Sequence, residues 1–219
     1  MDTHPLWFIG ISLVLALLPL VVGVFSSYLK VSIVLGFFRS GLGAQQVPGP
    51  LVIMGLSIGI TCAVMAPVFE QTLTAAETVP FEKITRHGPL QARDHLAPLI
   101  KPWKSFLEAH TGKRELEAFS RGRAEEESGS DEQTSPAWAV LLPSFIVSQL
   151  REAFTIGFLV LIPFLVIDII VANVLVGLGM YMLSPVIISL PLKLLLFLLA
   201  DGWLLLTGNL IASFGGHGV

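Results

Sequence analysis

The sequence predicts an all-α integral membrane protein, built from long kinked helical hairpins with a small helical polar insert. Hydrophobic residues make up 53% of the 219-residue chain and charged residues only 13%, whereas an ordinary soluble domain has about 25% charged residues. The charges are also unevenly distributed, because residues 70–137 hold 12 of the 16 acids and 9 of the 13 bases. This distribution indicates a membrane body interrupted by one polar insert. It leaves no basic patch large enough for binding nucleic acid.

Residues 138–219 are the most apolar part of the chain. Residues 153–192 contain a single charged side chain, Asp168, and residues 194–214 contain only Asp201. About 20 apolar residues cross the hydrocarbon core of a membrane as a helix, so this part has room for two spans with a break between them.

The break is expected at residues 177–185. Gly177 and Gly179 loosen the first helix, and Pro185 lacks an amide hydrogen and restricts the residue before it. We therefore expect a hairpin of two long apolar helices, preceded by a shorter helix at residues 138–151 that Pro143 interrupts. The tip of the hairpin is Met180-Tyr181-Met182.

Residues 1–69 are expected to hold two further spans, at residues 5–29 and 51–69. The N-terminal residues contain no Lys or Arg, and no cleavage site of small residues precedes Lys30. The first apolar run is therefore expected to remain as an uncleaved anchor. Between the spans, helical spacing of apolar residues predicts a short helix with Lys30 and Arg39 at its ends, followed by a Gly/Pro-rich loop.

The insert, residues 70–137, is expected to be mostly helical. Residues 102–119 show an irregular apolar face with Gly112 as a weak point. Residues 121–136 are acidic and rich in Ser and Gly, which is typical of a disordered loop. The three histidines of the insert, His87, His95 and His110, show no metal-ligand spacing and are expected at the surface.

An isolated charge in hydrocarbon costs several kcal/mol, so Asp168, Lys193 and Asp201 each require a partner or water. Lys193 and Asp201 are too far apart for a direct bond within one helix, whereas Asp168 on the other arm of the hairpin can reach either. One interpretation is ion pairing between helices or subunits. The other is a proton or ion relay, in which Asp168 couples the transport of a small molecule. Lys30 and Arg39 either extend to the membrane interface or are buried in an assembly.

The tip also allows two interpretations. Met180, Tyr181 and Met182 either fill a core or, repeated around a ring, seal a pore by excluding water, for which flexible methionines are well suited. The sequence contains none of the common catalytic motifs (GxSxG, HExxH, CxxC, the P-loop or GxGxxG). It therefore predicts neither an enzyme nor a cofactor.

Three segments together resemble one family: FLVIDIIVA at residues 164–172, VIISLP at 186–191 and KLLLF-x-x-x-DGW at 193–203. They resemble the FliP/SctR family, which comprises inner-membrane export-gate proteins of flagella and of type III secretion injectisomes. The resemblance covers residues 26–69 and 140–214. The uncleaved anchor favours the injectisome over the flagellum.

The resemblance implies a multi-pass protein of the bacterial inner membrane, surrounded by lipid, that acts without a cofactor. Several copies would join SctS-like and SctT-like subunits and other export-apparatus proteins in a helical cone. Unfolded protein substrates would pass through its centre, and the polar insert would lie on the extracytoplasmic side. The family's methionine-rich gasket falls on Met180, Tyr181 and Met182, with Tyr181 in place of the middle Met. Six charges match those of the family and are expected at contacts between subunits: Lys30, Arg39, Arg151, Asp168, Lys193 and Asp201.

Overall fold

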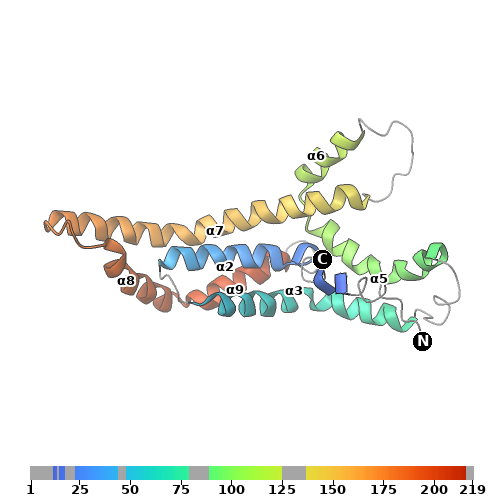
Figure 1. Ribbon diagram of the computed structural model, residues 1–219, viewed down its shortest axis with the longest axis horizontal. Coiled ribbons are helices and arrows are strands. Elements are labelled where there is room, and N and C mark those ends of the chain that lie inside the picture. The colour runs from blue at the N-terminus through green and yellow to red at the C-terminus, as the bar shows by residue number, and fades with distance from the viewer. Residues whose placement is uncertain are drawn as a thin grey trace.

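The computed structural model describes residues 12–13, 15–17, 23–43, 48–78, 89–124 and 137–215. These residues form helices and turns and contain no strand, which confirms the all-α class (Figure 1). The helices are α2 (Tyr28–Leu42), α3 (Pro50–Thr78), α5 (Pro89–Ala109), α6 (Lys113–Ala124), α7 (Trp138–Gly177), α8 (Pro185–Leu199) and α9 (Gly202–Gly215).

Within the described residues, two helices are long and apolar enough to cross a membrane: Pro50–Glu77 in α3 and Trp138–Gly177, which is the whole of α7. The bent pair of α8 and α9 makes a third candidate if the two helices together form one span. These segments agree with an integral membrane protein. The span expected at residues 51–69 lies in α3, which continues to Thr78. Most of the span expected at residues 5–29 lies outside the described residues.

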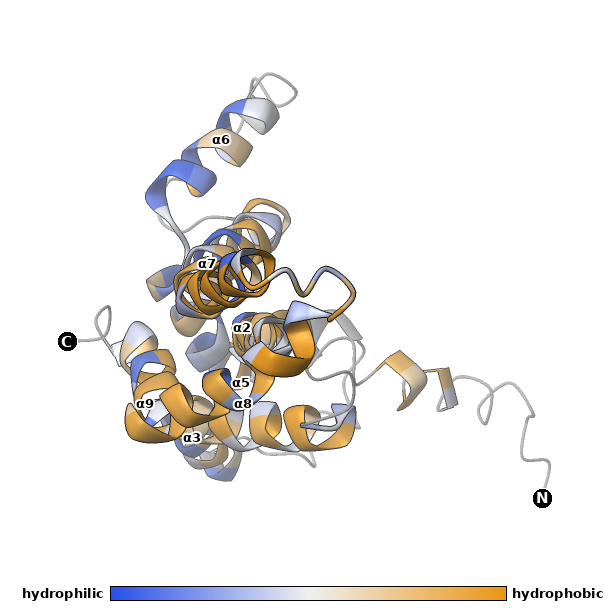
Figure 2. Cartoon of the chain, turned by 90° about the vertical axis from the view of Figure 1, so that its left-hand side faces the viewer, coloured by the Kyte–Doolittle hydropathy of each residue, from blue (hydrophilic) through white to orange (hydrophobic). Residues whose placement is uncertain are grey.

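Helix α2 lies at the centre of the bundle, between α7 and α3 (Figures 1 and 2). Val31, Val34, Leu35 and Phe38 are all fully buried. Their spacing places them on neighbouring turns of one helix face, and burial of each large apolar side chain contributes about 1.5–3 kcal/mol. The short helix predicted between Lys30 and Arg39 is therefore the core element around which the longer helices pack.

The contact between α2 and α7 depends on glycines. A Cβ atom added at Gly157 of α7 would overlap the ring of Phe37, and one added at Gly41 of α2 would lie 2.6 Å from Cδ2 of Phe164. Each aromatic ring thus packs directly on the backbone of the opposite helix. Small residues permit this close approach between membrane helices.

Helix α7 is continuous over 40 residues and contains Pro143 and Pro163. The interruption predicted at Pro143 is therefore wrong. A proline removes one hydrogen bond from a helix interior, but neighbouring helices can hold the flanking turns in place. Here α2 packs along α7, and the hydroxyl of Ser144 donates to the carbonyl of Val140, 2.6 Å away.

The second arm of the hairpin is not one helix. It bends by 64° between α8 and α9. Asp201 occupies the bend with a φ of 47°, a left-handed conformation in which Asp is among the few tolerated non-glycine residues. Gly202 follows, and a Cβ atom there would overlap the ring of Phe197. The bend turns α9 back against α3 and α8.

The polar insert contains α5 and α6, which are separated at residues 110–112, so the weak point predicted at Gly112 coincides with a break between helices. Helix α6 extends to Ala124. The first four residues of the loop predicted to be disordered, residues 121–124, are therefore helical, and residues 125–136 lie outside the described part. The boundaries of the three predicted regions, 1–69, 70–137 and 138–219, stay a prediction.

Replacing Gly157 with Ala should destabilise the protein by about 1–3 kcal/mol, the range for overpacking a core, because Phe37 must leave its place on α7. The matched control is Gly36→Ala in α2, where an added Cβ meets nothing within 4 Å. That change should be neutral or stabilise by up to about 1 kcal/mol. Thermal unfolding of the purified variants in detergent measures both effects. Equal melting temperatures for the two variants would contradict the close contact.

Candidate functional site

The ammonium group of Lys193 joins three helices. Its Nζ lies 2.7 Å from Oδ2 of Asp168 in α7 and donates to the carbonyl of Gly41, at the end of α2, over 2.8 Å. The Lys193 side chain is 2% exposed and that of Asp168 33%. Carbonyl groups in the last turn of a helix lack partners within that helix and attract cations, which accounts for the contact with Gly41.

Ser189 completes this junction. It precedes Lys193 by one turn on the same face of α8, and its hydroxyl donates to Oδ1 of Asp168 over 2.6 Å. Both carboxylate oxygens are therefore hydrogen bonded. Of the two partners that the sequence allowed for Asp168, the structure brings Lys193 to it. The arrangement fixes the register of α8 against α7, and it leaves neither carboxylate oxygen without a partner.

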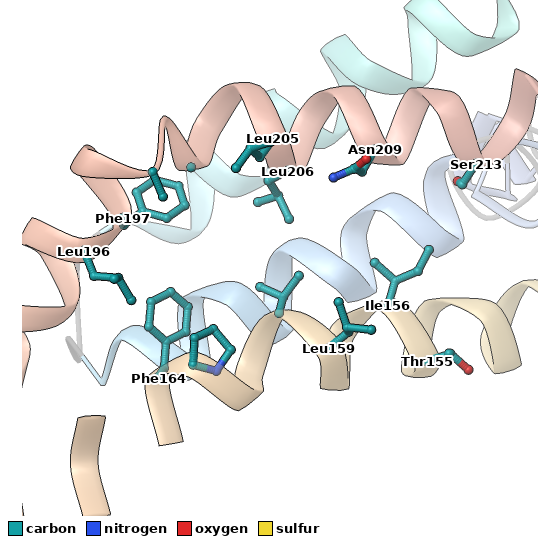
Figure 3. Close-up of a pocket in the computed structure, with 14 residues that line it drawn as sticks. Thr155, Ile156, Leu159, Phe164, Leu196, Phe197, Leu205, Leu206, Asn209 and Ser213 are labelled. Carbon is teal, nitrogen blue, oxygen red and sulfur yellow. The ribbon is translucent and has the colours of Figure 1, made fainter. Parts of the chain in front are cut away.

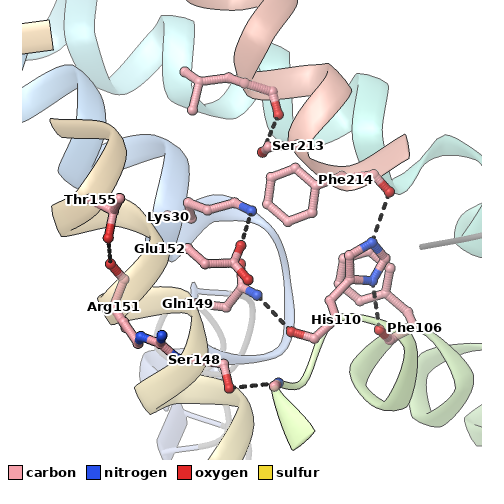
Figure 4. Close-up of polar contacts among 12 residues, drawn as sticks. Lys30, Phe106, His110, Ser148, Gln149, Arg151, Glu152, Thr155, Ser213 and Phe214 are labelled. Carbon is pink, nitrogen blue, oxygen red and sulfur yellow. Dashed lines mark hydrogen bonds and ion pairs between the residues drawn. The ribbon is translucent and has the colours of Figure 1, made fainter. Parts of the chain in front are cut away.

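A second buried ammonium group, that of Lys30, joins the start of α2 to α7 and α9 (Figure 4). Its side chain is fully buried, and its Nζ lies 2.7 Å from Oε2 of Glu152. The same Nζ lies 3.7 Å from the centre of the Phe214 ring, a cation–π contact. Burial lowers the pKa of Lys30, and the hydrogen bond and charge of Glu152 oppose this effect. Lys30 is buried within the chain itself, whereas the burial considered from the sequence was inside an assembly.

Arg151 connects α7 to the insert. Its Nη1 donates to Oε1 of Glu115 in α6 over 2.9 Å. A hydrogen bond from its own backbone and then the contact with Arg151 lower the pKa of Glu115. Ser148 and Gln149 strengthen the connection, since the Ser148 hydroxyl accepts from the amide of Gly112 and the Gln149 amide donates to the carbonyl of His110. The turn between α5 and α6 is thus fixed to α7.

Arg39 and Asp201 differ from the other four predicted charges. Arg39 is in the last turn of α2, and Asp201 is exposed at the bend between α8 and α9. Among the described residues, neither makes an ion pair, whereas Lys30, Arg151, Asp168 and Lys193 are each paired inside the chain. The expected contacts of all six with other subunits stay a prediction.

The tip residues project from the far end of the hairpin (Figure 1). Met180 is 42% exposed, Tyr181 77% and Met182 fully exposed. The alternative in which they fill a core therefore does not hold within a single chain. Gly179, with a φ of 75°, lets the chain turn away from α7.

A mostly apolar groove of about 750 Å³ lies between α7, α8 and α9. Figure 3 shows Phe164 and Phe197 at the end near the bend, and Asn209 and Ser213 toward the other end. The groove exists because the second arm bends, which the sequence analysis did not foresee. The part of the chain that the structure describes contains no group of side chains able to hold a metal ion.

Sequence reasoning missed four of the polar partners: Ser189, Glu152, Glu115 and His110. Only Ser189 had a local signal, its spacing of four residues from Lys193. Glu115 lies 36 residues from its partner Arg151 and Glu152 lies 122 residues from Lys30. His110, expected at the surface, is half-buried and contacts the carbonyl of Phe214.

The arrangement is that of an apolar helical membrane protein whose buried charges fix the helices and whose one apolar loop is exposed. The sequence model of the FliP family matches residues 11–210. The chain belongs to the FliP family.

Curated relatives support this assignment. The Yop proteins translocation protein R of Yersinia pestis is 39% identical over 92% of this chain and 93% of its own length. The virulence protein YscR of Salmonella typhimurium is 36% identical over 96% of this chain and 97% of its own length. The flagellar biosynthetic protein FliP of Caulobacter vibrioides is 36% identical over 94% of this chain and 75% of its own length.

Replacing Asp168 with Asn should destabilise the folded chain by about 3–5 kcal/mol, the cost of breaking a buried ion pair, because the ammonium of Lys193 then keeps only neutral partners. The matched control is Asp201→Asn, which removes a carboxylate that makes no ion pair among the described residues. Asn also tolerates the left-handed backbone. Chemical unfolding in detergent compares the two variants. A smaller loss for Asp168→Asn than for Asp201→Asn would contradict the junction described above.

Proposed function

We propose that this chain is the core pore-forming subunit of a type III secretion export apparatus, passing unfolded protein substrates across the bacterial inner membrane. Its membership of the FliP family supports a role in protein export, since relatives in that family are named for translocation, virulence and flagellar biosynthesis. The observation that supports the pore is the tip: a loop of bulky, exposed apolar side chains at the end of an apolar helical hairpin.

Several copies arranged around one axis bring their tips together. The side chains of Met180, Tyr181 and Met182 then form an apolar constriction, which blocks water and ions by dewetting. Methionine side chains are flexible and fill gaps of changing shape. They yield to an extended polypeptide and close again behind it, and Tyr181 supplies the bulk of the missing middle methionine.

The exposed surface supports assembly. Only 17% of the most apolar window of α7 is buried within the chain, and Arg39 and Asp201 have no ion-pair partner among the described residues. Lipid covers part of this surface. We propose that further copies and SctS-like and SctT-like membrane subunits cover the rest, that Arg39 and Asp201 pair with these neighbours, and that the chain crosses the inner membrane several times without catalysing a reaction.

The alternative function, transport of an ion or small molecule coupled through Asp168, receives less support. A coupling carboxylate must bind and release its ion, whereas both oxygens of Asp168 are held by Lys193 and Ser189.

Native mass spectrometry of the detergent-purified protein, expressed with and without its neighbouring genes, tests the assembly. We expect a discrete complex of several copies that gains small membrane subunits when these are co-expressed. Asp201→Asn should weaken the complex and leave the melting temperature of the chain unchanged. A stable monomer that recruits no partner would refute the proposed function and return attention to Asp168.

Replacing Met180, Tyr181 and Met182 together with glycine should make the membrane leak small ions, because the constriction loses its apolar bulk. The matched control is Tyr181→Met, which restores three consecutive methionines and should keep the seal. Ion conductance of cells or vesicles holding the assembled complex gives the measurement. A tight membrane with the glycine variant, in a complex of normal size, would exclude the tip as the seal.

A further inference from the structure

His110 directly follows helix α5, at a point where three parts of the chain meet (Figure 4). Its Nδ1 lies 2.8 Å from the carbonyl oxygen of Phe106, one turn back in α5. Its Nε2 lies 2.9 Å from the carbonyl oxygen of Phe214, in the last turn of α9 and 104 residues further along the chain. A single imidazole ring therefore links the polar insert to the end of the C-terminal helix.

The two contacts require both ring nitrogens of His110 to act as hydrogen-bond donors. A carbonyl oxygen only accepts hydrogen bonds, so each ring nitrogen must donate. Neutral imidazole has one N–H group and one lone pair, and only the imidazolium ion has two N–H groups. In the neutral ring, one nitrogen would direct its lone pair at a carbonyl oxygen less than 3 Å away. Only the protonated ring can make both hydrogen bonds at once.

The surroundings of the ring also suit a cation. The ring centre of His110 lies 4.3 Å from that of Phe106 and 5.4 Å from that of Phe214, and aromatic faces attract cations. Of the charged groups facing this region, α7 contributes Glu152, which lines a small cavity of about 40 Å³ together with His110. Helix α2 contributes Lys30, whose charge Glu152 balances at 2.7 Å.

Among the described residues, the other charged side chains of this region are paired or lie at exposed positions. Arg151 of α7 and Glu115 of α6 bind one another beyond the turn at Gly112. On α5 itself, Lys104 and Glu108 pair at 3.8 Å. Helix α3 has its acids, Glu70 and Glu77, at exposed positions, and α9 has no charged residue.

We propose that His110 is a proton-binding site that clasps α5 to α9. With both nitrogens protonated, the ring donates to Phe106 and Phe214 at once. When the proton on Nε2 leaves to water, the hydrogen bond to Phe214 is lost, and the end of α9 separates from the insert. The proton concentration on the side of the membrane that the insert faces thus sets how firmly the insert is held. This site is independent of the tip and of the proposed pore.

Electron paramagnetic resonance distance measurements on the full chain in lipid nanodiscs test the clasp. Cys62, the free and exposed cysteine of α3, is first replaced with Ala. Spin labels are then attached to cysteines at the exposed positions Ser105 of α5 and Ala212 of α9. Spectra are recorded at about pH 5.5 and about pH 8.5, which bracket the range in which histidines change charge.

We expect the ratio of the short-distance to the long-distance population to fall about fivefold from the lower to the higher pH, as the loss of one hydrogen bond predicts. His110→Gln, which has no titrating ring, should abolish the change. The matched control His95→Gln, in α5, should retain it. An unchanged wild-type distribution, a persistent response in His110→Gln or a lost response in His95→Gln would each overturn the proposal. If His110→Gln fails to fold, the pH dependence of the wild-type distances still tests the proposal.

Discussion

The buried ammonium group of Lys193 is the constraint on which the arrangement of the helices depends. A cation removed from water is tolerated only where anionic and carbonyl oxygens surround it. Those oxygens come from α7 and from the end of α2. The buried ammonium group of Lys30, at the start of α2, likewise requires an anionic partner, which is Glu152 of α7. Helix α2 is therefore held to α7 near both of its ends, and the packing of Phe37 on Gly157 brings the two helices together between these points.

This arrangement separates a fixed base from a free tip. The three ion pairs connect α7 to α2, α6 and α8 at Glu152, Arg151 and Asp168. Beyond Asp168, no ion pair among the described residues holds α7 to another helix, and its last turns lead to an exposed loop. The plug that we propose for the tip requires such a division, because its side chains would have to move while the helices that support them keep their register.

Local patterns in the sequence were sufficient for the helices, the membrane class and the position of the hairpin turn. Helical spacing identifies the buried face of α2, and Gly177, Gly179 and Pro185 mark the turn. The bend at Asp201 was missed because its neighbours form an unbroken apolar run, and a left-handed residue other than glycine has no clear signature. The partners Glu115 and Glu152 were missed because the folded chain, and not local spacing, brings them to Arg151 and Lys30. Continuous packing along α7 likewise overrides the expected effect of Pro143.

The charges of the membrane body divide into two groups with different physical roles. Four of them have ion-pair partners inside the chain: Lys30, Arg151, Asp168 and Lys193. The free energy of these ion pairs therefore contributes to the stability of the single chain. Arg39 and Asp201 have opposite charges and no ion-pair partner among the described residues, and Asp201 lies exposed at the bend. A charge next to apolar surface gains most when a neighbour of opposite charge removes it from contact with hydrocarbon. The fold thus leaves the charges of Arg39 and Asp201 for the contacts between subunits that we propose, while the other four charges stabilise the single chain.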